Sequence, residues 1–171
     1  RGDTAQFAAE GRPSAKKDQG MMLMAYGNVY IAQVAMGASH NQTVRAFMEA
    51  ESYPGPSIII AYANCIAHGI NMINGLSEMD KAVKSGHWML YRYNPALMDQ
   101  GKNPLQLDSK EPSIPYEEYA YGENRWRTLK VSDPERAAML MKLAQQDANR
   151  RWNIYRQMAE MDYSMDGNGS K

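Results

Sequence analysis

The feature that most constrains the fold is the apolar run at residues 57–63, which contains three consecutive isoleucines. A Pro-Gly-Pro turn at residues 54–56 precedes it, and Cys65 follows it by two residues. A short apolar run bounded by turn residues is typical of a strand buried on both faces of a parallel sheet. In such sheets, functional residues lie just beyond the carboxyl ends of the strands. We therefore expect residues 57–63 to form a central strand that presents Cys65 at a functional edge.

A second strand and a helix precede this run. Residues 29–36 are rich in β-branched side chains and predict another buried strand. Ser39, with Gln42 three residues later, forms a capping box for a helix that continues to about residue 52. Strand, helix and strand within about 35 residues predict a βαβ unit with parallel strands and a right-handed crossover.

The remaining pattern predicts an α/β chain. We expect a partial three-layer domain with a mostly parallel sheet of about three strands, flanking helices, a long extended arm and a C-terminal helix. The third strand carries Arg92, which favours an edge position. We expect the C-terminal helix to begin at an N-cap Ser132. The predicted ranges are a helix at 14–26, a loop at 66–75, a helix at 77–85, a strand at 88–93, an extended connection at 94–115 with a short strand at 105–108, a helix at 116–125, a long helix to about 162 and a disordered tail at 166–171.

Composition limits the class of function. The chain has 171 residues, and its 19 Lys and Arg balance its 19 Asp and Glu, which argues against nucleic acid or a membrane as the main partner. No apolar run is long enough for a transmembrane helix. A single cysteine excludes an intrachain disulfide and predicts a cytoplasmic location. The 14 methionines and the start without Met predict a piece of something larger, with Met-rich interfaces and homo-oligomers.

Cys65 is the main candidate for chemistry, and the residues alone leave three interpretations open. It is a small buried residue, a nucleophile with His68 as its base, or one ligand of a metal site. A four-iron cluster takes four thiolates, so the other ligands would have to come from outside the chain.

Other polar residues give weaker signals. The three histidines, His40, His68 and His87, lack the spacing of a zinc site, and no phosphate-loop motif is present. His87 is predicted to be structural. The cations Arg92, Lys102 and Lys110 could meet an anionic ligand, although solvated surface charge is the favoured interpretation.

Several stretches together resemble the C-terminal part of the thiamine-diphosphate domain of pyruvate:ferredoxin (flavodoxin) oxidoreductases. They are GDTAQFAAEGRPSAKKDQG, YGNVYIAQVAMGASHNQTVRAF, EAESYPGPSIIIAYANCIAHG, AVKSGHWMLYRYNP and GKNPLQLDSK. The resemblance is dense over residues 1–130 and looser over residues 131–171, which we therefore separate as a C-terminal helix and tail.

The resemblance implies oxidative decarboxylation of pyruvate on thiamine diphosphate with Mg²⁺. Electrons pass through [4Fe–4S] clusters to ferredoxin or flavodoxin, and CoA takes up the acetyl group. It also implies that Cys65 is one ligand of the cluster nearest the thiamine, with three thiolates coming from an upstream ferredoxin-like region.

The diphosphate and Mg²⁺ motif of that family precedes the stretch that this chain covers, so no catalytic or thiamine-contacting residue is assigned. Residues 2–7 are the stretch that would follow it most closely. We expect the chain alone to be inactive and to bind neither cofactor. The alternatives are a non-catalytic interaction or assembly module that keeps the fold and, less favoured, a thiol enzyme that uses Cys65 and His68.

Overall fold

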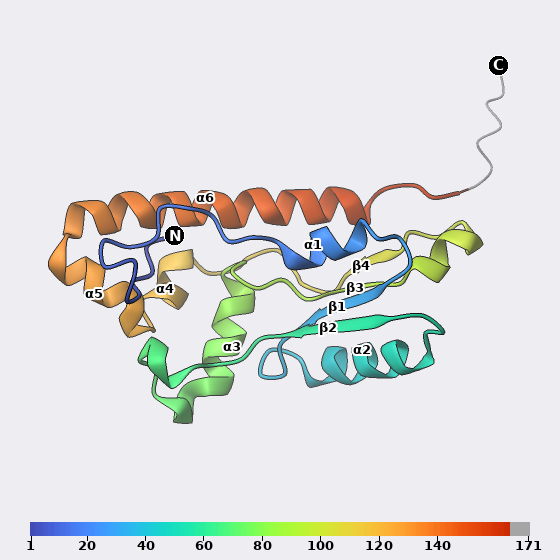
Figure 1. The fold of residues 1–171 in the computed structure, drawn as a ribbon, viewed down its shortest axis with the longest axis horizontal. Coiled ribbons are helices and arrows are strands. Elements are labelled where there is room, and N and C mark those ends of the chain that lie inside the picture. Colours follow the sequence, from blue (N-terminus) through green and yellow to red (C-terminus); the bar gives the residue numbers. More distant parts are fainter. Residues whose placement is uncertain (165–171) are drawn as a thin grey trace, which may run out of the picture.

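A four-stranded mixed sheet forms the centre of the computed structural model, which describes residues 1–164 (Figure 1). The strands are β1 (Tyr30–Val34), β2 (Ser57–Ala61), β3 (Tyr91–Tyr93) and β4 (Leu105–Leu107), in the order β2-β1-β3-β4. Strands β1 and β2 are parallel, whereas β3 runs antiparallel to both of its neighbours. The predicted α/β class and the parallel pair of the βαβ unit are confirmed. The predicted mostly parallel sheet of about three strands is wrong, because β3 pairs antiparallel with both neighbours and β4 adds a fourth strand.

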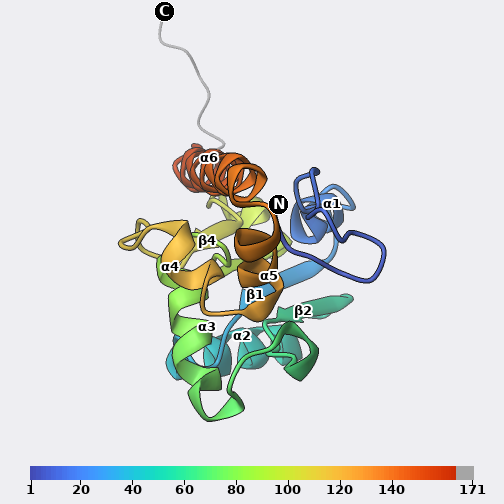
Figure 2. The ribbon, with the colours of Figure 1, turned by 90° about the vertical axis from the view of Figure 1, so that its left-hand side faces the viewer.

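Helices cover both faces and one end of this sheet (Figures 1 and 2). Helices α1 and α6 lie on one face, α2 lies on the other, and α3, α4 and α5 gather at one end. None of the helices in residues 1–164 is both long and apolar enough to cross a membrane. The α-helices are α1 (Gln19–Met24), α2 (His40–Ser52), α3 (Gly75–Lys84), α4 (Tyr116–Ala120), α5 (Asn124–Ser132) and α6 (Pro134–Ala159), and the 3₁₀ turns are Ile66–His68, Met72–Asn74 and Pro95–Gln100.

The alternation of side chains along the strands explains the layers. In β1 every residue is buried: Tyr30, Ala32 and Val34 pack in the cluster on the α2 side, whereas Ile31 packs in the cluster that includes α1 and α6. Helix α6 contributes Trp152 and Tyr155 to that second cluster. Because successive side chains of a strand point to opposite faces, a fully buried strand requires a helical layer on each side.

The predicted central position of residues 57–63 is wrong. Strand β2 ends at Ala61 and lies at the edge of the sheet, with its isoleucines half-buried and Ser57 and Ala61 exposed. Helices α1 and α2 cover its two faces, so Ile58 and Ile59 contact different layers. Coverage of both faces produces the apolar run, but the run carries no information about whether a further strand pairs along the open edge.

The predicted edge position of the third strand is also wrong. Strand β3 lies between β1 and β4, and Arg92 is buried on the α2 side. Its guanidinium pairs with Glu49 of α2 and, at 2.8 Å, with Asp108 just after β4. Two carboxylates neutralise the charge, which allows an arginine in a central strand.

Several boundaries differ from the prediction, and four of them have a clear local cause or consequence. Helix α1 begins later, because the Asp18 carboxylate accepts the backbone N–H of Met21 and so caps the helix. Helix α3 begins at Gly75, before the predicted cap Ser77. The predicted helix at 116–125 is divided into α4 and α5.

Helix α6 is capped by Asp133 rather than by Ser132, which is the last residue of α5. The extended conformation before a proline, here Pro134, favours Asp133 as the cap. The short strand within 105–108 is confirmed, and the predicted tail at 166–171 lies outside the described residues.

Replacing Arg92 by Ala should strongly destabilise the protein, because Glu49 and Asp108 would lose their buried partner. We expect the free energy of unfolding in urea to fall by about 3–5 kcal/mol. Arg156→Ala is the matched control, since Arg156 pairs with Glu160 on the exposed surface of α6, where a loss of under about 1 kcal/mol is expected. Equal effects of the two substitutions would contradict this role for Arg92.

Candidate functional site

Cys65 lies four residues beyond the carboxyl end of β2, in an extended conformation that leads into a 3₁₀ turn. The thiol side chain is half-buried and forms no disulfide. The polypeptide on both sides of it is anchored: the Asn64 amide donates to the Gly75 carbonyl at 2.8 Å, and the His68 N–H donates to the Cys65 carbonyl at 3.0 Å. The backbone therefore holds one thiol at the edge of the sheet.

Exposed apolar side chains follow this cysteine along the chain. Ile66 is 76% exposed and Ile73 is 90% exposed, and both lie in the 3₁₀ turns that follow Cys65. Met72 and Leu76 of the same segment are also exposed. Exposed apolar groups of this kind are typical of surfaces that other protein segments cover.

Within residues 1–164, no group of three or more His, Cys, Asp or Glu side chains is arranged to hold a metal ion. A thiolate is the donor that iron–sulfur clusters take, so the local chemistry fits Cys65 as a single ligand and requires the other ligands to come from elsewhere.

The His68 ring is directed toward Arg125 and Glu123. Its Nε2 lies 3.5 Å from the guanidinium of Arg125, which can only donate, so the neutral ring carries its proton on Nδ1. Nδ1 in turn lies 4.0 Å from the Glu123 carboxylate. Burial and the charge of Arg125 lower the pKa of His68, which favours this neutral form. No hydrogen bond joins His68 to the thiol in the described part of the chain, so the geometry does not support the predicted nucleophile and base.

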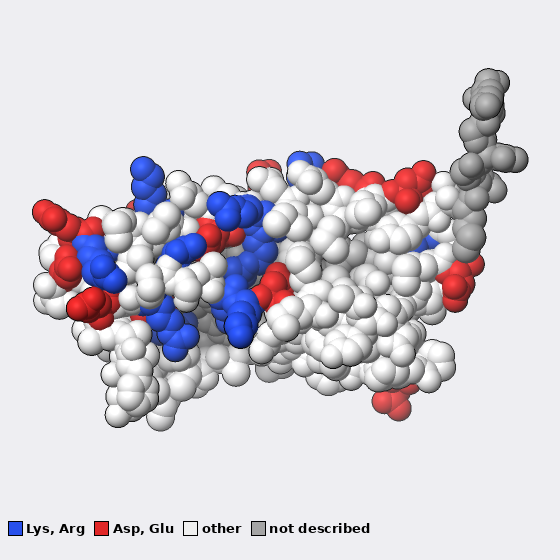
Figure 3. Space-filling model, turned by 45° about the horizontal axis from the view of Figure 1, so that its top comes forward, with Lys and Arg blue, Asp and Glu red and all other residues white. Residues whose placement is uncertain are grey.

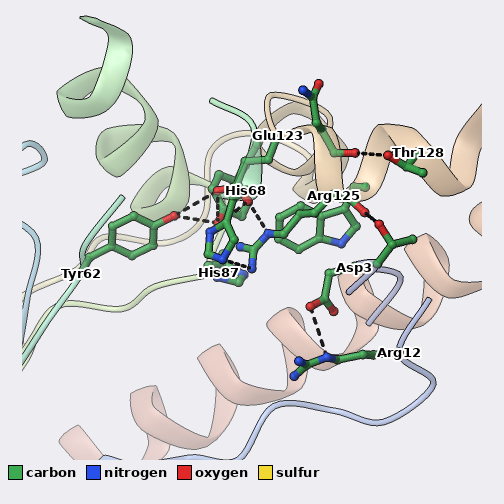
Figure 4. A network of polar contacts seen from close by, with 12 residues as sticks. Asp3, Arg12, Tyr62, His68, His87, Glu123, Arg125 and Thr128 are labelled. Carbon is green, nitrogen blue, oxygen red and sulfur yellow. Dashed lines mark hydrogen bonds and ion pairs between the residues drawn. The ribbon is translucent and has the colours of Figure 1, made fainter. Parts of the chain in front are cut away.

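Glu123 is the centre of a buried polar network that the sequence did not reveal (Figure 4). It lies at the N-cap of α5 and is 1% exposed. Its carboxylate pairs with Arg125 and accepts hydrogen bonds from the hydroxyls of Tyr119 at 3.2 Å and Tyr62 at 3.4 Å. The two hydroxyls lie 2.8 Å apart. One arginine neutralises this buried acid, and two phenols from other segments complete its hydrogen bonds.

This network connects the segment around Cys65 to the α4–α5 turn. Tyr62 precedes the cysteine by three residues and His68 follows it by three, and both face Glu123 (Figure 4). Burial and the neighbouring Glu123 charge raise the pKa of Tyr62 to about 12, so this phenol remains protonated and continues to donate. The contacts hold the two ends of the cysteine segment against one fixed acid.

A cavity of about 580 Å³ lies next to this network, between the N-terminal segment and α6. His87 contributes to its wall, and its Nδ1 lies 2.7 Å from the Tyr116 hydroxyl. Figure 3 shows basic side chains gathered around a hollow on this side of the molecule. Arg1, Lys16 and Arg151 are among the residues that line the cavity.

The cations that the sequence singled out are not brought together. Arg92 is buried in its ion pairs, Lys110 is exposed, and Lys102 donates to its near neighbour Gln100. The favoured interpretation of surface charge is wrong for Arg92. Glu123 and Arg125 were missed because nothing in a local pattern distinguishes a buried acid from a solvated one; only the break after Gly122 hints at a cap.

Replacing Glu123 by Gln should loosen the cysteine segment, because the amide cannot neutralise Arg125. We expect a loss of about 2–4 kcal/mol in unfolding free energy, together with faster alkylation of Cys65. The measurement is the rate of iodoacetamide labelling followed by mass spectrometry. Glu160→Gln, on the surface of α6, is the control and should change neither quantity. Unchanged labelling in a destabilised Glu123→Gln protein would show that the network does not hold the segment.

Comparison with known proteins identifies relatives over almost the whole chain. A pyruvate-flavodoxin oxidoreductase of Nostoc sp. is 54% identical over 155 residues, which cover 91% of this chain and 13% of the relative. A pyruvate:ferredoxin oxidoreductase of Moorella thermoacetica is 52% identical over 159 residues, 93% of this chain and 14% of the relative. A pyruvate-flavodoxin oxidoreductase of Rhodospirillum rubrum is 45% identical over 166 residues, 97% of this chain and 14% of the relative.

No protein-family model matches the chain. The chain spans about one seventh of the length of the relatives it matches. The resemblance inferred from the sequence motifs is confirmed: the chain is homologous to a segment of the pyruvate-flavodoxin and pyruvate:ferredoxin oxidoreductases.

Proposed function

We propose that the chain acts as a segment of a pyruvate:flavodoxin or pyruvate:ferredoxin oxidoreductase and that Cys65 binds an iron–sulfur cluster. The parent reaction converts pyruvate and CoA to acetyl-CoA and CO₂ and passes two electrons, one at a time, to ferredoxin or flavodoxin. The observation that carries the proposal is a single anchored thiol four residues beyond β2, in a segment with exposed apolar side chains, in a chain homologous to these enzymes.

In this proposal the chain's own residues position one ligand. The Asn64 and His68 contacts fix the backbone on both sides of Cys65, and the exposed Ile66 and Ile73 exclude water once a neighbouring domain covers them. The cluster, [4Fe–4S], supplies one-electron transfer when bound. A ligand held by a rigid backbone keeps the cluster at a constant distance from the domain that supplies the electrons.

The open edge of β2 supports the proposal that residues 1–130 complete a larger thiamine-diphosphate domain. Strand β2 leaves one side without a partner in the described residues, and half-buried isoleucines lie along it. Met22 of α1 and Phe47 of α2 are exposed on the helices that flank the two faces of this strand. An apolar edge is normally paired or covered, so further strands of the parent protein fit here. Those strands would carry the residues that hold thiamine diphosphate and Mg²⁺.

The cytoplasmic location and the homo-oligomer remain parts of the proposal, as does the separation of residues 131–171. The single cysteine supports a reducing compartment. The exposed methionines, among them Met48 and Met139, support extensive interfaces.

One rival function keeps the fold without catalysis and uses the same exposed apolar surface as an assembly interface. The thiol enzyme is the weaker rival, because His68 faces Glu123 and Arg125. The two rivals and the proposal make different predictions for substitution of Cys65 and His68.

In the full-length protein, Cys65→Ala should remove one cluster, because an alanine offers no ligand atom. We expect a loss of about four iron atoms and four sulfide ions per chain, equal to one [4Fe–4S] cluster, measured by iron and sulfide analysis and by electron paramagnetic resonance. His68→Gln is the control and should keep the iron content and pyruvate oxidation. Unchanged iron in Cys65→Ala with full activity would support the assembly module, and loss of activity in both variants without loss of iron would support the thiol enzyme.

The 171-residue chain alone should bind neither cofactor, because a single thiolate does not hold a cluster. We expect no stoichiometric iron or acid-labile sulfide after purification under argon, and no saturable binding of thiamine diphosphate with Mg²⁺ in titration calorimetry. Stoichiometric iron and sulfide in the isolated chain would contradict this expectation.

A further inference from the structure

The cavity beside the Glu123 network has an unusual balance of charge. Five Lys and Arg side chains line it, and two Asp side chains accompany them. Figure 3 shows the basic side chains that gather around the hollow. They come from separate parts of the chain: the N-terminal segment, the α5 region and α6. The five cations are Arg1, Arg12, Lys16, Arg125 and Arg151.

Three of these cations have acidic partners. Arg1 pairs with Asp147 at 2.6 Å, and Arg12 lies 3.5 Å from Asp3. The third, Arg125, pairs with Glu123 behind the cavity wall. These three pairs therefore contribute little net charge to the space between them.

Lys16 and Arg151 have no carboxylate partner within residues 1–164. The Lys16 ammonium lies 5.2 Å from the centre of the Trp88 ring, and Arg151 donates one hydrogen bond to the His87 carbonyl at 3.3 Å. Two positive charges at one cavity therefore remain without a carboxylate partner, Arg151 half-buried and Lys16 exposed at the cavity's mouth, which favours an anion between them.

The pKa shifts of Lys16 and His87 agree with a net positive charge in the cavity. Burial and the charge of Arg151 lower the pKa of Lys16, which indicates that the two cations repel each other across a partly desolvated space. His87 contributes no charge of its own, because burial and these same cations hold its pKa well below the ordinary value. The uncompensated charge is therefore two.

We propose that this cavity binds a phosphate dianion or a phosphate monoester between Lys16 and Arg151. A dianion matches the two uncompensated charges, and arginine with lysine is the usual pair of side chains for a phosphate. The volume of about 580 Å³ exceeds the size of phosphate alone and leaves room for the organic part of a monoester. This site does not depend on Cys65 or on the proposed cluster, and it differs from the diphosphate site that the family resemblance implies upstream.

The test is the acetylation rate of Lys16 in the full-length protein, with and without inorganic phosphate, at equal ionic strength maintained with sodium chloride. Quantitative mass spectrometry of the peptides resolves Lys16 from other lysines. We expect saturating phosphate to slow labelling of Lys16 by about threefold or more, since the bound anion occupies its ammonium group. Lys110, which is exposed and does not line the cavity, is the internal control and should not change.

Arg151→Gln should raise the phosphate concentration needed for half-maximal protection by about tenfold or more, because one charge-assisted contact is lost. Arg150→Gln removes the same charge from an exposed neighbour on α6 that does not line the cavity, and it should leave protection unchanged. If Arg151→Gln does not fold, Arg151→Lys, which keeps the charge, should retain part of the protection.

Three results would overturn the proposal. Lys16 labelling that phosphate does not slow in the unaltered protein would show that the cavity holds no phosphate. Lys16 that is unreactive with and without phosphate would show that another segment of the full-length protein fills the cavity. Equal weakening by Arg150→Gln and Arg151→Gln would reduce the effect to general charge and would also refute the site.

Discussion

The ion pairs of Arg92 are the interaction on which the rest of the fold depends. This guanidinium is buried in the third strand and contacts an acid from α2 and an acid that follows β4. The Gln42 amide of α2 also donates to Asp108 at 3.0 Å, so the same acid connects a helical layer to the sheet. A buried charge costs several kcal/mol when one partner is removed. The order of the strands and the position of α2 are therefore coupled through one side chain.

Glu123 is a second buried charge, at the other end of the molecule, that also requires its partners. Its carboxylate is satisfied only when α5 begins at its observed residue, when the Tyr62 hydroxyl after β2 reaches it and when the Arg125 guanidinium pairs with it. The network therefore fixes the path of the chain before and after Cys65. The two buried charges therefore have separate roles. Arg92 fixes the arrangement of the sheet and α2, and Glu123 fixes the path of the segment that follows β2.

The local parts of the fold were predictable because their causes are local. The Ser39 hydroxyl accepts the Gln42 N–H as the capping box predicts, and α2 ends at the predicted residue. The buried charges were not predictable, because an arginine in a strand and a glutamate in a turn look the same whether solvent or distant acids and tyrosines surround them. The edge position of β2 was missed for a similar reason. Apolar side chains on both faces of a strand indicate that helices cover both faces, whereas strand order depends on hydrogen bonds to segments far away in the sequence. At the candidate site, the position of Cys65 beyond a strand followed from the sequence, but the orientation of His68 away from it did not.

The proposed role of Cys65 as the only cluster ligand from this segment places a demand on the fold. A lone thiolate gains nothing from proximity to other ligands within its own segment, so its position must be fixed by the fold before the cluster arrives. In this chain that requirement is met by contacts on both sides of the cysteine, from Asn64 before it and from His68 after it. A flexible segment would lose conformational entropy on binding and would weaken the attachment of the cluster. The exposed isoleucines that follow Cys65 and the open edge of β2 have the same implication, because each is costly in a solitary chain and useful where a neighbouring domain packs against it.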